Sequence, residues 1–204
     1  MSRGRVALGV PSGAGEVVRE GVARRLAEFS PQSKVHVVAQ PAGVLAAAAT
    51  CRPEILQQTV AIVDVGRYST DVSISVRGRP VAGSLFSLPG VRAAVEAVSA
   101  LLSRVLRGTI GFESLEAALS TGEIVHRRQH QDVRDEARQA RDRLHEIVLD
   151  AVTRIQALQP DVQMLILAGG GADRLDAKRL PPHGPGLGGR YAVADGLGRI
   201  AASM

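Results

Sequence analysis

Several residue types that define whole classes of protein are scarce in this 204-residue sequence. Cys51 is the only cysteine, so a disulfide framework and a cysteine-based metal site are excluded, and a reducing, cytoplasmic setting is expected. Tryptophan is absent and aromatic residues make up 2%, so the core must consist of Val, Leu, Ile and Ala, which favours an α/β protein with buried strands. The longest apolar run, residues 42–50, is too short to cross a bilayer, and the N-terminus lacks the apolar region of a signal peptide. We therefore expect a soluble protein with no membrane partner.

Lysine is also scarce, since only Lys34 and Lys178 occur, and arginine supplies nearly all of the positive charge behind a formal net charge of +5. A basic balance favours a nucleic acid or an acidic surface as a partner. However, the arginines are scattered over predicted helix faces, and no stretch interleaves them with aromatic residues. We interpret the charge as surface chemistry rather than as a nucleic-acid interface.

The residues that are present predict an alternation of strands and helices. Apolar residues make up 45% of the chain and recur with the period of a strand or of a helix. The residues between 181 and 189 are rich in proline and glycine and predict a loop. The predicted strands are residues 5–10, 34–39, 59–65, 70–76, 80–84 and 161–167, and the predicted helices are residues 16–29, 43–50, 91–107, 112–119, 132–158 and 191–203.

A candidate phosphate-binding turn lies within residues 63–71. Asp64 falls at the end of a predicted buried strand and Gly66 lies just beyond it, so backbone N–H groups could approach a phosphate closely. The Asp64 carboxylate could hold a Mg²⁺ shell or orient an attacking water. Thr70 could donate its hydroxyl to the same phosphate, and Asp71 could fix the turn. The alternative interpretation is a β-hairpin with an Asx-type turn.

A second candidate segment contains three consecutive glycines at positions 169–171, directly after the predicted strand at residues 161–167. Such a segment forms a flat backbone platform that a purine or a phosphate can lie against. The pattern is not GxGxxG, and no acid follows it at the Rossmann spacing, which argues against a dinucleotide site. The alternative is a glycine-rich connection between a strand and a helix.

Small residues mark two further segments. Residues 40–47 (QPAGVLAA) place Gln40 at a strand end, where its side chain could touch a cleft, and the small residues after it allow close helix packing. Residues 194–199 (ADGLGR) place glycines inside a helix, where each costs about 1 kcal/mol relative to alanine, so close packing is the natural reason for them. Taken alone, residues 40–47 fit equally well a helix that begins at a proline.

The order of these four segments resembles that of the actin-like ATPases. Gln-Pro-Ala-Gly, Asp-x-Gly-x-x-x-Thr-Asp, Ala-Gly-Gly-Gly-Ala and Ala-Asp-Gly-x-Gly are similar to what that superfamily calls connect 1, phosphate 2, adenosine and connect 2. The ParM-type plasmid-segregation actins are the most similar. The resemblance implies a partial actin-like (ribonuclease H-like) α/β fold, a mixed β-sheet flanked by helices. Residues 1–58 would be the C-terminal part of a first lobe and residues 59–204 a second lobe, with a helical insertion at about 91–158.

The resemblance also implies roles for particular residues, with ATP and Mg²⁺ as cofactors. Asp64 would position the metal or the attacking water, and so would be both a catalytic residue and a metal ligand. Gln40 lies where MreB-type relatives place a catalytic Glu; Gln can orient water but cannot accept its proton, so slow hydrolysis is expected. The implied nucleotide-binding set is Asp64, Gly66, Ser69, Thr70, Asp71, Gly169, Gly170, Gly171 and Ala172.

The sequence departs from the actin-like pattern at its N-terminus. Residues 6–11 (VALGVP) resemble a Gly-Leu-Pro stretch that follows the phosphate 1 motif in the family, and no second Asp-x-Gly turn precedes them. We expect a truncated reading frame, a partner chain that supplies the missing lobe, or a degenerate actin that no longer hydrolyses ATP. ATPase activity is expected only if the phosphate 1 region is supplied.

The functional hypothesis is a nucleotide-dependent, filament-forming protein that acts in plasmid segregation. Its partners would be an adenine nucleotide, further copies of itself or a related actin-like chain, and a possible DNA-binding adaptor. The main alternative is a non-hydrolysing partial lobe that joins or regulates a filament made by another chain. A small-molecule kinase or phosphatase of the same superfamily fits less well, because no sugar-binding or acyl-binding loop is recognisable.

Overall fold

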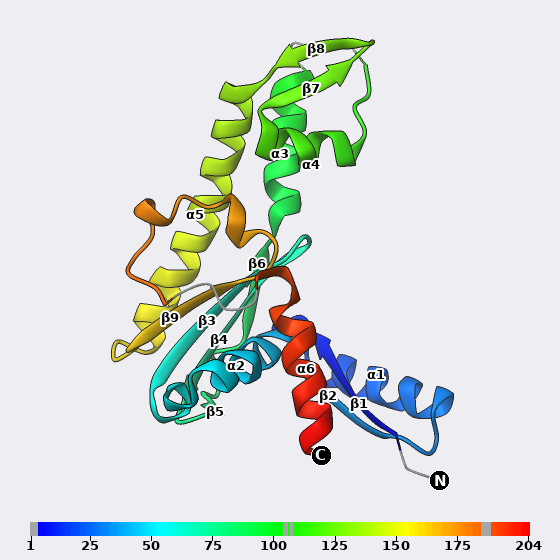
Figure 1. The fold of residues 1–204 in the computed structure, drawn as a ribbon, viewed down its shortest axis with the longest axis vertical. Helices are drawn as coiled ribbons and strands as arrows, with labels where there is room; N and C mark the ends of the chain where they lie inside the picture. Colours follow the sequence, from blue (N-terminus) through cyan, green and yellow to red (C-terminus); the bar gives the residue numbers. More distant parts are fainter. Residues whose placement is uncertain (1–3, 104–105, 107, 185–188) are drawn as a thin grey trace.

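A computed structural model describes residues 4–103, 106, 108–184 and 189–204, arranged in three parts along the long axis of the molecule (Figure 1). A small unit of two strands and one helix lies at the end that carries both termini, a mixed sheet forms the middle, and a helical arm projects from the sheet. The mixed α/β fold, a sheet flanked by helices, agrees with the predicted fold class. None of the helices in the described ranges is long and apolar enough to span a membrane.

The central sheet has five strands in the order β5-β4-β3-β9, with β6 also pairing with β4. Strands β3 and β4 are antiparallel, as predicted for residues 59–65 and 70–76, whereas β3 and β9 are parallel. Every residue of β3 from Val60 onward is buried, because both faces of the sheet are covered. The strands are β3 (Thr59–Val65), β4 (Ser69–Val76), β5 (Arg79–Pro80), β6 (Phe86–Pro89) and β9 (Met164–Ala168).

The predicted strand at residues 80–84 is wrong. Strand β5 ends at Pro80, and one further N–H, that of Val81, donates to the Ile74 carbonyl at 2.9 Å. The strand that continues the sheet is β6, at residues 86–89. Between them Gly83 takes a left-handed φ of 76°, and the Ser84 hydroxyl replaces a backbone partner by accepting from the Ile74 N–H at 3.1 Å. The short helix Pro53–Gln57 precedes β3 and packs under the same sheet.

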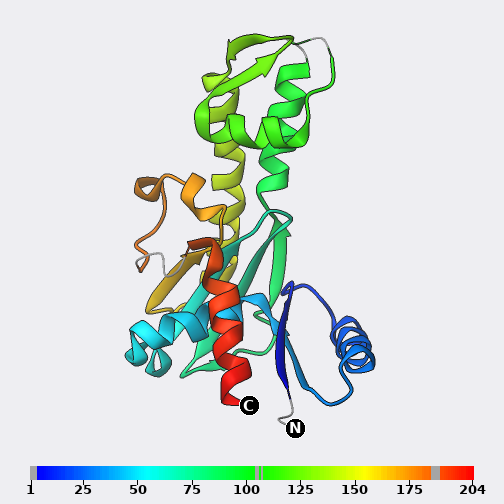
Figure 2. The same ribbon diagram turned by 45° about the vertical axis from the view of Figure 1, so that its right-hand side comes forward.

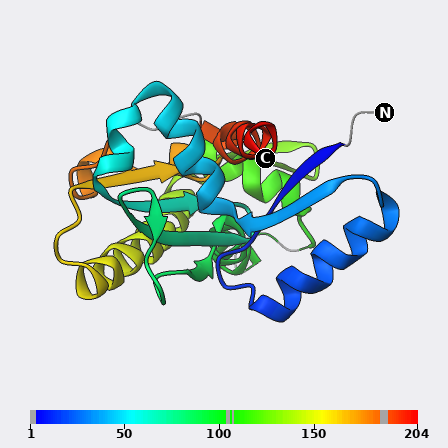
Figure 3. The same cartoon turned by 90° about the horizontal axis from the view of Figure 1, so that it is seen from below.

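Helices cover the two faces of the sheet with separate cores (Figure 3). On one face, α3 (Val91–Ser103) and α5 (Arg134–Leu158) pack on Ala61, Val63 and Val65. On the other, α2 (Gln40–Cys51) packs on Val60 and Ile62. The alternating faces of one strand therefore supply both cores. Helix α2 begins at Gln40 rather than at the predicted residue 43, because Pro41 is favourable in a first turn.

The helical arm is formed by α3, α4 (Phe112–Thr121), a hairpin and α5. The hairpin of β7 (Glu123–His126) and β8 (Gln129–Asp132) was not predicted, since its turn uses Arg127 and Arg128 at left-handed φ instead of an Asn-Gly or Asp-Gly pair. The long helix predicted from residue 132 begins at Arg134, whose N–H donates to the Asp132 carboxylate at 3.1 Å. The last residues of the helix predicted at 91–107 fall partly outside the described residues.

The small unit consists of β1 (Arg5–Val10), α1 (Glu16–Phe29) and β2 (Lys34–Ala39), all at their predicted positions, with the two strands parallel. All residues of α1 are described, and none of them is buried. The last helix, α6 (Ala192–Ser203), packs on both β1 and α2 (Figure 2). The remaining short helices are Ala172–Arg174, Ala177–Arg179 and Gly189–Tyr191.

Candidate functional site

The two turns singled out in the sequence lie against each other. Strands β3 and β9 are parallel neighbours with Asp64 opposite Ala168. The segments that follow them therefore leave the sheet side by side, at the carboxyl ends of the two strands. The Gly171 N–H donates to the Val65 carbonyl at 2.8 Å. A Cβ atom on Gly169 would lie 2.5 Å from Asp64 Oδ1, so the carboxylate is packed directly on the glycine backbone. The acid-bearing turn and the glycine turn are therefore one structural feature, although about a hundred residues separate them in sequence.

Asp64 is a buried acid whose charge is not compensated. Its residue is 5% exposed, and among the described residues its side chain has no hydrogen-bond or ion-pair partner. Burial, and secondarily the charge of Asp71 on the neighbouring strand, raise the pKa of the Asp64 carboxyl to about 6. A cation or a water molecule beside the Asp64 carboxylate would offset the free-energy cost of burying its ionised form.

Asp71 differs from Asp64 because three donors satisfy it. Its Oδ1 accepts from the Ser12 N–H and the Ser87 hydroxyl, and its Oδ2 accepts from the Ser69 hydroxyl, each at 2.6 Å. Asp71 thus holds the end of the 66–69 turn and fastens the segment after β1 to the central sheet. The Gly13 N–H adds a bond of 2.7 Å to the Ser87 hydroxyl.

Thr70 is also occupied by the protein itself. Its side chain is fully buried, and its hydroxyl donates to the Pro89 carbonyl at 3.0 Å. The same turn supports the start of α3, because the Val91 N–H donates to the Gly66 carbonyl at 3.0 Å. Gly90 permits this approach, since a Cβ there would lie 2.5 Å from the Gly66 oxygen. Thr70 therefore joins β6 to the turn.

The three glycines after β9 have different structural reasons. Gly169 takes a φ of 85°, and a Cβ on Gly171 would lie 2.5 Å from Val65 Cγ1, so both positions require glycine for contacts within the protein. A Cβ on Gly170 would meet only the Cβ of Arg190, at 3.4 Å, which is ordinary contact. The Ala172 N–H donates back to Gly169, closing a tight turn. Gly170 therefore has the most open face of the three.

The two predicted segments of small residues, 40–47 and 194–199, contact each other, and Gln40 lies at the start of the first one. Gln40 is the first residue of α2, and its Cγ lies beside Gly9 of β1. The described hydrogen bonds of Asp71, the acid of the 66–69 turn, are made by other residues and not by Gln40. Further along, a Cβ on Gly196 of α6 would overlap the carbonyl oxygen of Gly43. The prediction that small residues allow close helix packing is confirmed at this crossing, although Gly198 has nothing within 4 Å.

Sequence reasoning missed a charged group beside the two turns. Glu116 of α4 pairs with Arg67, at the tip of the 66–69 turn, at 3.0 Å and with Arg174, just after the glycine turn, at 3.3 Å. Arg67 also lies over the Phe112 ring, 4.5 Å from its centroid. The available signal was an arginine within the first turn and another just after the second, but the acid that joins them lies on a helix whose position no local pattern predicts.

An acid-bearing turn beside a glycine turn, on a mixed sheet flanked by helices, is the arrangement expected of an actin-like protein. Residues 62–179, more than half of the chain, match the model of the family described as archaeal actin homologue MreB-like, C-terminal. The chain belongs to this family and, with it, to the actin-like ATPase superfamily. A search among curated proteins found no match.

Solved structures of the same fold are longer than this chain. The archaeal actin homologue Ta0583 is 23% identical with a TM-score of 0.71, covering 84% of this chain and 57% of that one. A MamK double helical filament is 17% identical with a TM-score of 0.75, covering 97% and 68%. A ParM filament from Clostridium botulinum is 16% identical with a TM-score of 0.73, covering 97% and 66%. At these identities the three structures show the actin-like fold alone. This chain spans 57% of the length of Ta0583.

Proposed function

We propose that this chain forms one wall of an adenine-nucleotide site in a filament-forming, actin-like protein. The observation that carries the proposal is the direct contact between the Asp64 turn and the glycines at 169–171, which makes one continuous backbone surface at the edge of the sheet. One structure of the archaeal actin homologue Ta0583, 21% identical, is a complex with ADP. That structure supports an adenine nucleotide as the ligand.

Within this proposal, the residues act in two groups. Ser69 and Gly170 would offer backbone to the phosphates and the adenosine. Gly66 and Ala172, whose N–H groups donate to the Ser69 and Gly169 carbonyls, would line the same surface, while Thr70 and Asp71, which other protein groups occupy, hold the turn in position. Gly169 and Gly171 bring the two turns together. Gln40 would orient water from the start of α2.

Mg²⁺ fits the site through Asp64. This carboxylate is buried without a partner among the described residues, which a divalent cation would correct. No group of three or more potential metal ligands occurs in the described part of the chain, so phosphate oxygens and water would complete the shell. The ion would neutralise charge on the phosphates.

We propose the division into residues 1–58 and 59–204, with the insertion at about 91–158, as the domain organisation. It is supported by the separate β1–β2 sheet and by the helical arm, although α6 returns to pack on β1. Within the described chain, β1 has a strand neighbour on one side only. Further polypeptide, continuous or separate, would add the opposite wall of the cleft.

Filament formation and plasmid segregation are the finer parts of the proposal. The solved ParM and MamK filaments of the same fold support self-association or assembly with a related chain. Segregation through a DNA-binding adaptor follows the resemblance to ParM-type actins. The second candidate is a partial lobe that joins a filament without hydrolysing ATP. It is favoured because Thr70 and Asp71 are already hydrogen-bonded within the protein. Asp64 is then the one acid of the turn that is left without a partner among the described residues.

Calorimetric titration with ATP and ADP, with and without Mg²⁺, tests the site. We expect Asp64→Ala to weaken Mg²⁺-dependent binding by about tenfold or more, since a metal-bridged charge contact is lost. The control Asp161→Ala, at an exposed acid before β9, should leave the affinity unchanged. Absence of binding at millimolar nucleotide would contradict the proposal.

Sedimentation with ATP then tests assembly. The proposal predicts nucleotide-dependent pelleting of the chain, alone or with the polypeptide that completes the cleft, and absence of pelleting under every nucleotide condition would count against it. ATP hydrolysis by this chain alone, abolished by Asp64→Ala, would exclude the non-hydrolysing alternative.

A further inference from the structure

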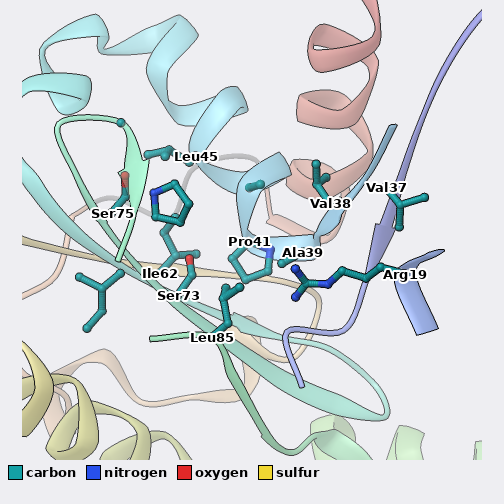
Figure 4. Close-up of a pocket in the computed structure, with 14 residues that line it drawn as sticks. Arg19, Val37, Val38, Ala39, Pro41, Leu45, Ile62, Ser73, Ser75 and Leu85 are labelled. Carbon is teal, nitrogen blue, oxygen red and sulfur yellow. The ribbon is translucent and has the colours of Figure 1, made fainter. Parts of the chain in front are cut away.

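A cavity of about 240 Å³ lies away from the two turns, where the small unit, α2 and the outer part of β4 meet (Figure 4). Its β4 residues are Ser73, Ile74 and Ser75, further along the strand than the 66–69 turn, and Ser73 and Ser75 lie opposite Ile62 and Val60 of β3. The cavity is therefore separate from the two turns, although Gln40 of the proposed site lies between its lining residues Ala39 and Pro41. Its lining also includes Arg19, residues 37–39, Pro41, Ala42, Leu45, Ile62, Ile74, Gly78, Pro80 and Leu85.

The lining combines an apolar body with polar groups at its two ends. Most of the lining residues are aliphatic, and Arg19 is the only charged residue among those that the structure describes there. In Figure 4, Arg19 extends from α1 toward Pro41 and Leu85, whereas Ser75 lies on the opposite side of the cavity, near Leu45. The cavity thus has a cationic end and a hydroxyl end.

Both ends contain buried polar atoms without a partner. Arg19 Nε and Ser75 Oγ are inaccessible to solvent and have no hydrogen bond to any described residue. Ser75 is 4% exposed, and no carboxylate among the described residues pairs with Arg19. Buried donors without partners are destabilising, and most such groups in proteins are satisfied by protein, water or ligand.

We propose that this cavity binds a small amphipathic organic carboxylate. The carboxylate would pair with the Arg19 guanidinium, whose planar donors suit that group, and the apolar body would lie on Pro41, Leu45 and Ile62. A hydroxyl or carbonyl at the far end would bond Ser75. A phosphate ester fits less well, because one arginine supplies the only charge and the walls are apolar.

Such a ligand would connect two parts of the molecule. Arg19 and residues 37–39 belong to the small unit, whereas Ser75 and Ile62 belong to the central sheet. The occupied site would therefore restrain the small unit against the sheet, independently of any nucleotide.

Calorimetry on the whole chain with para-hydroxyphenylpropanoate tests the proposal, with the corresponding amide as the neutral analogue. We expect saturable binding of the acid, weakened about tenfold or more in Arg19→Gln and in the amide, because a charge-assisted bond is lost. The matched control Arg24→Gln, on the same helix at an exposed position that does not line the cavity, should bind as the wild type does.

Ser75→Ala provides the second variant. It should weaken the hydroxylated probe several-fold and leave phenylpropanoate, which lacks the hydroxyl, unchanged. Because it removes an unsatisfied buried hydroxyl, its melting temperature should equal or exceed that of the wild type. The proposal is overturned if the acid does not bind at millimolar concentration, if acid and amide bind equally, or if Arg24→Gln weakens binding as much as Arg19→Gln.

Discussion

Helices α5 and α1 cover their strands in very different ways. Helix α5 buries nine residues against the central sheet and the arm, whereas α1, described along its whole length, buries none. Both sequences have the apolar spacing of a helix, so periodicity predicted both helices equally well. The amount buried depends instead on what the helix packs against: a five-stranded sheet together with α3 and α4 in one case, and a two-stranded sheet in the other.

The comparison indicates that the central sheet carries most of the stability and that the small unit is held by few contacts. The bonds of Asp71 and Ser87 to Ser12 and Gly13 join the two at one end, and α6 packs on β1 at the other.

Gly169→Ala should be the most damaging of the changes considered. Alanine is strained at a φ of 85°, and its Cβ would lie 2.5 Å from both Asp64 Oδ1 and the Val65 carbonyl oxygen. We expect the free energy of unfolding, measured with urea, to fall by about 4 kcal/mol. Gly170→Ala is the matched control and should change it by less than about 0.5 kcal/mol, and a loss in Gly169→Ala as small as that of the control would show that the turns are not in contact.

Leu144→Ala in α5 should lower the free energy of unfolding by about 3 kcal/mol, because the side chain is fully buried and leaves a cavity. The counterpart in α1 is Phe29→Ala, because Phe29 is 79% exposed. Its loss should change the free energy of unfolding by no more than about 0.5 kcal/mol. Urea denaturation of both variants measures the difference directly. A large loss in Phe29→Ala would mean that α1 is covered in solution.

Asp64 makes stability depend on pH in a defined direction. A folded-state pKa of about 6, against 3.8 for a solvent-exposed aspartate carboxyl, means that folding favours the protonated acid. The resulting stabilisation is fully present below about pH 4, declines as the pH rises toward 6, and is absent above it. The free energy of unfolding of Asp64→Asn should therefore equal that of the wild type near pH 4 and exceed it by about 2 kcal/mol at pH 7.

Urea denaturation between pH 4 and 7 measures this dependence, with Asp161→Asn as the exposed control. Saturating Mg²⁺ and nucleotide should remove part of the difference, since they favour ionised Asp64. Parallel pH profiles for wild type and Asp64→Asn would show that the carboxyl is not in the environment described.

The smallest effect is expected in α1. Gly21 lies inside the helix with nothing within 4 Å of the position a Cβ would take, so Gly21→Ala should stabilise the protein by about 0.5 kcal/mol. Gly196→Ala in α6 should do the opposite, because its Cβ would overlap the Gly43 carbonyl oxygen. Thermal unfolding of the two variants compares them, and destabilisation by Gly21→Ala would reveal contacts on α1 that the structure does not contain.

The local sequence pattern was sufficient to predict most helices and strands, but it did not predict the β7–β8 hairpin or the position of β6. The strands at 5–10, 34–39 and 59–65 were predicted correctly because β-branched runs bounded by turns are local signals. The β7–β8 hairpin was missed because Arg127 and Arg128 adopt a left-handed backbone that arginine rarely takes. Strand β6 was misplaced because Ser84 substitutes for backbone pairing, which depends on a residue ten positions away.

The candidate site was predictable only in part. The contact between the Asp64 turn and the glycine turn followed from the resemblance to actin-like proteins, and the parallel pairing of β3 with β9 provides it. The bonds that occupy Asp71, and the pairing of Glu116 with Arg67 and Arg174, join residues that are distant in sequence. Such partners depend on the packed fold, which periodicity does not specify.

The account depends most on the claim that both turns contact one nucleotide. Backbone amide NMR spectra recorded as Mg²⁺ and ADP are added test it directly. We predict that the amides of Gly66, Ser69 and Gly170 shift together with one apparent affinity, while those of α1 stay in place. Shifts confined to one of the two turns, or no shifts at millimolar ADP, would contradict it.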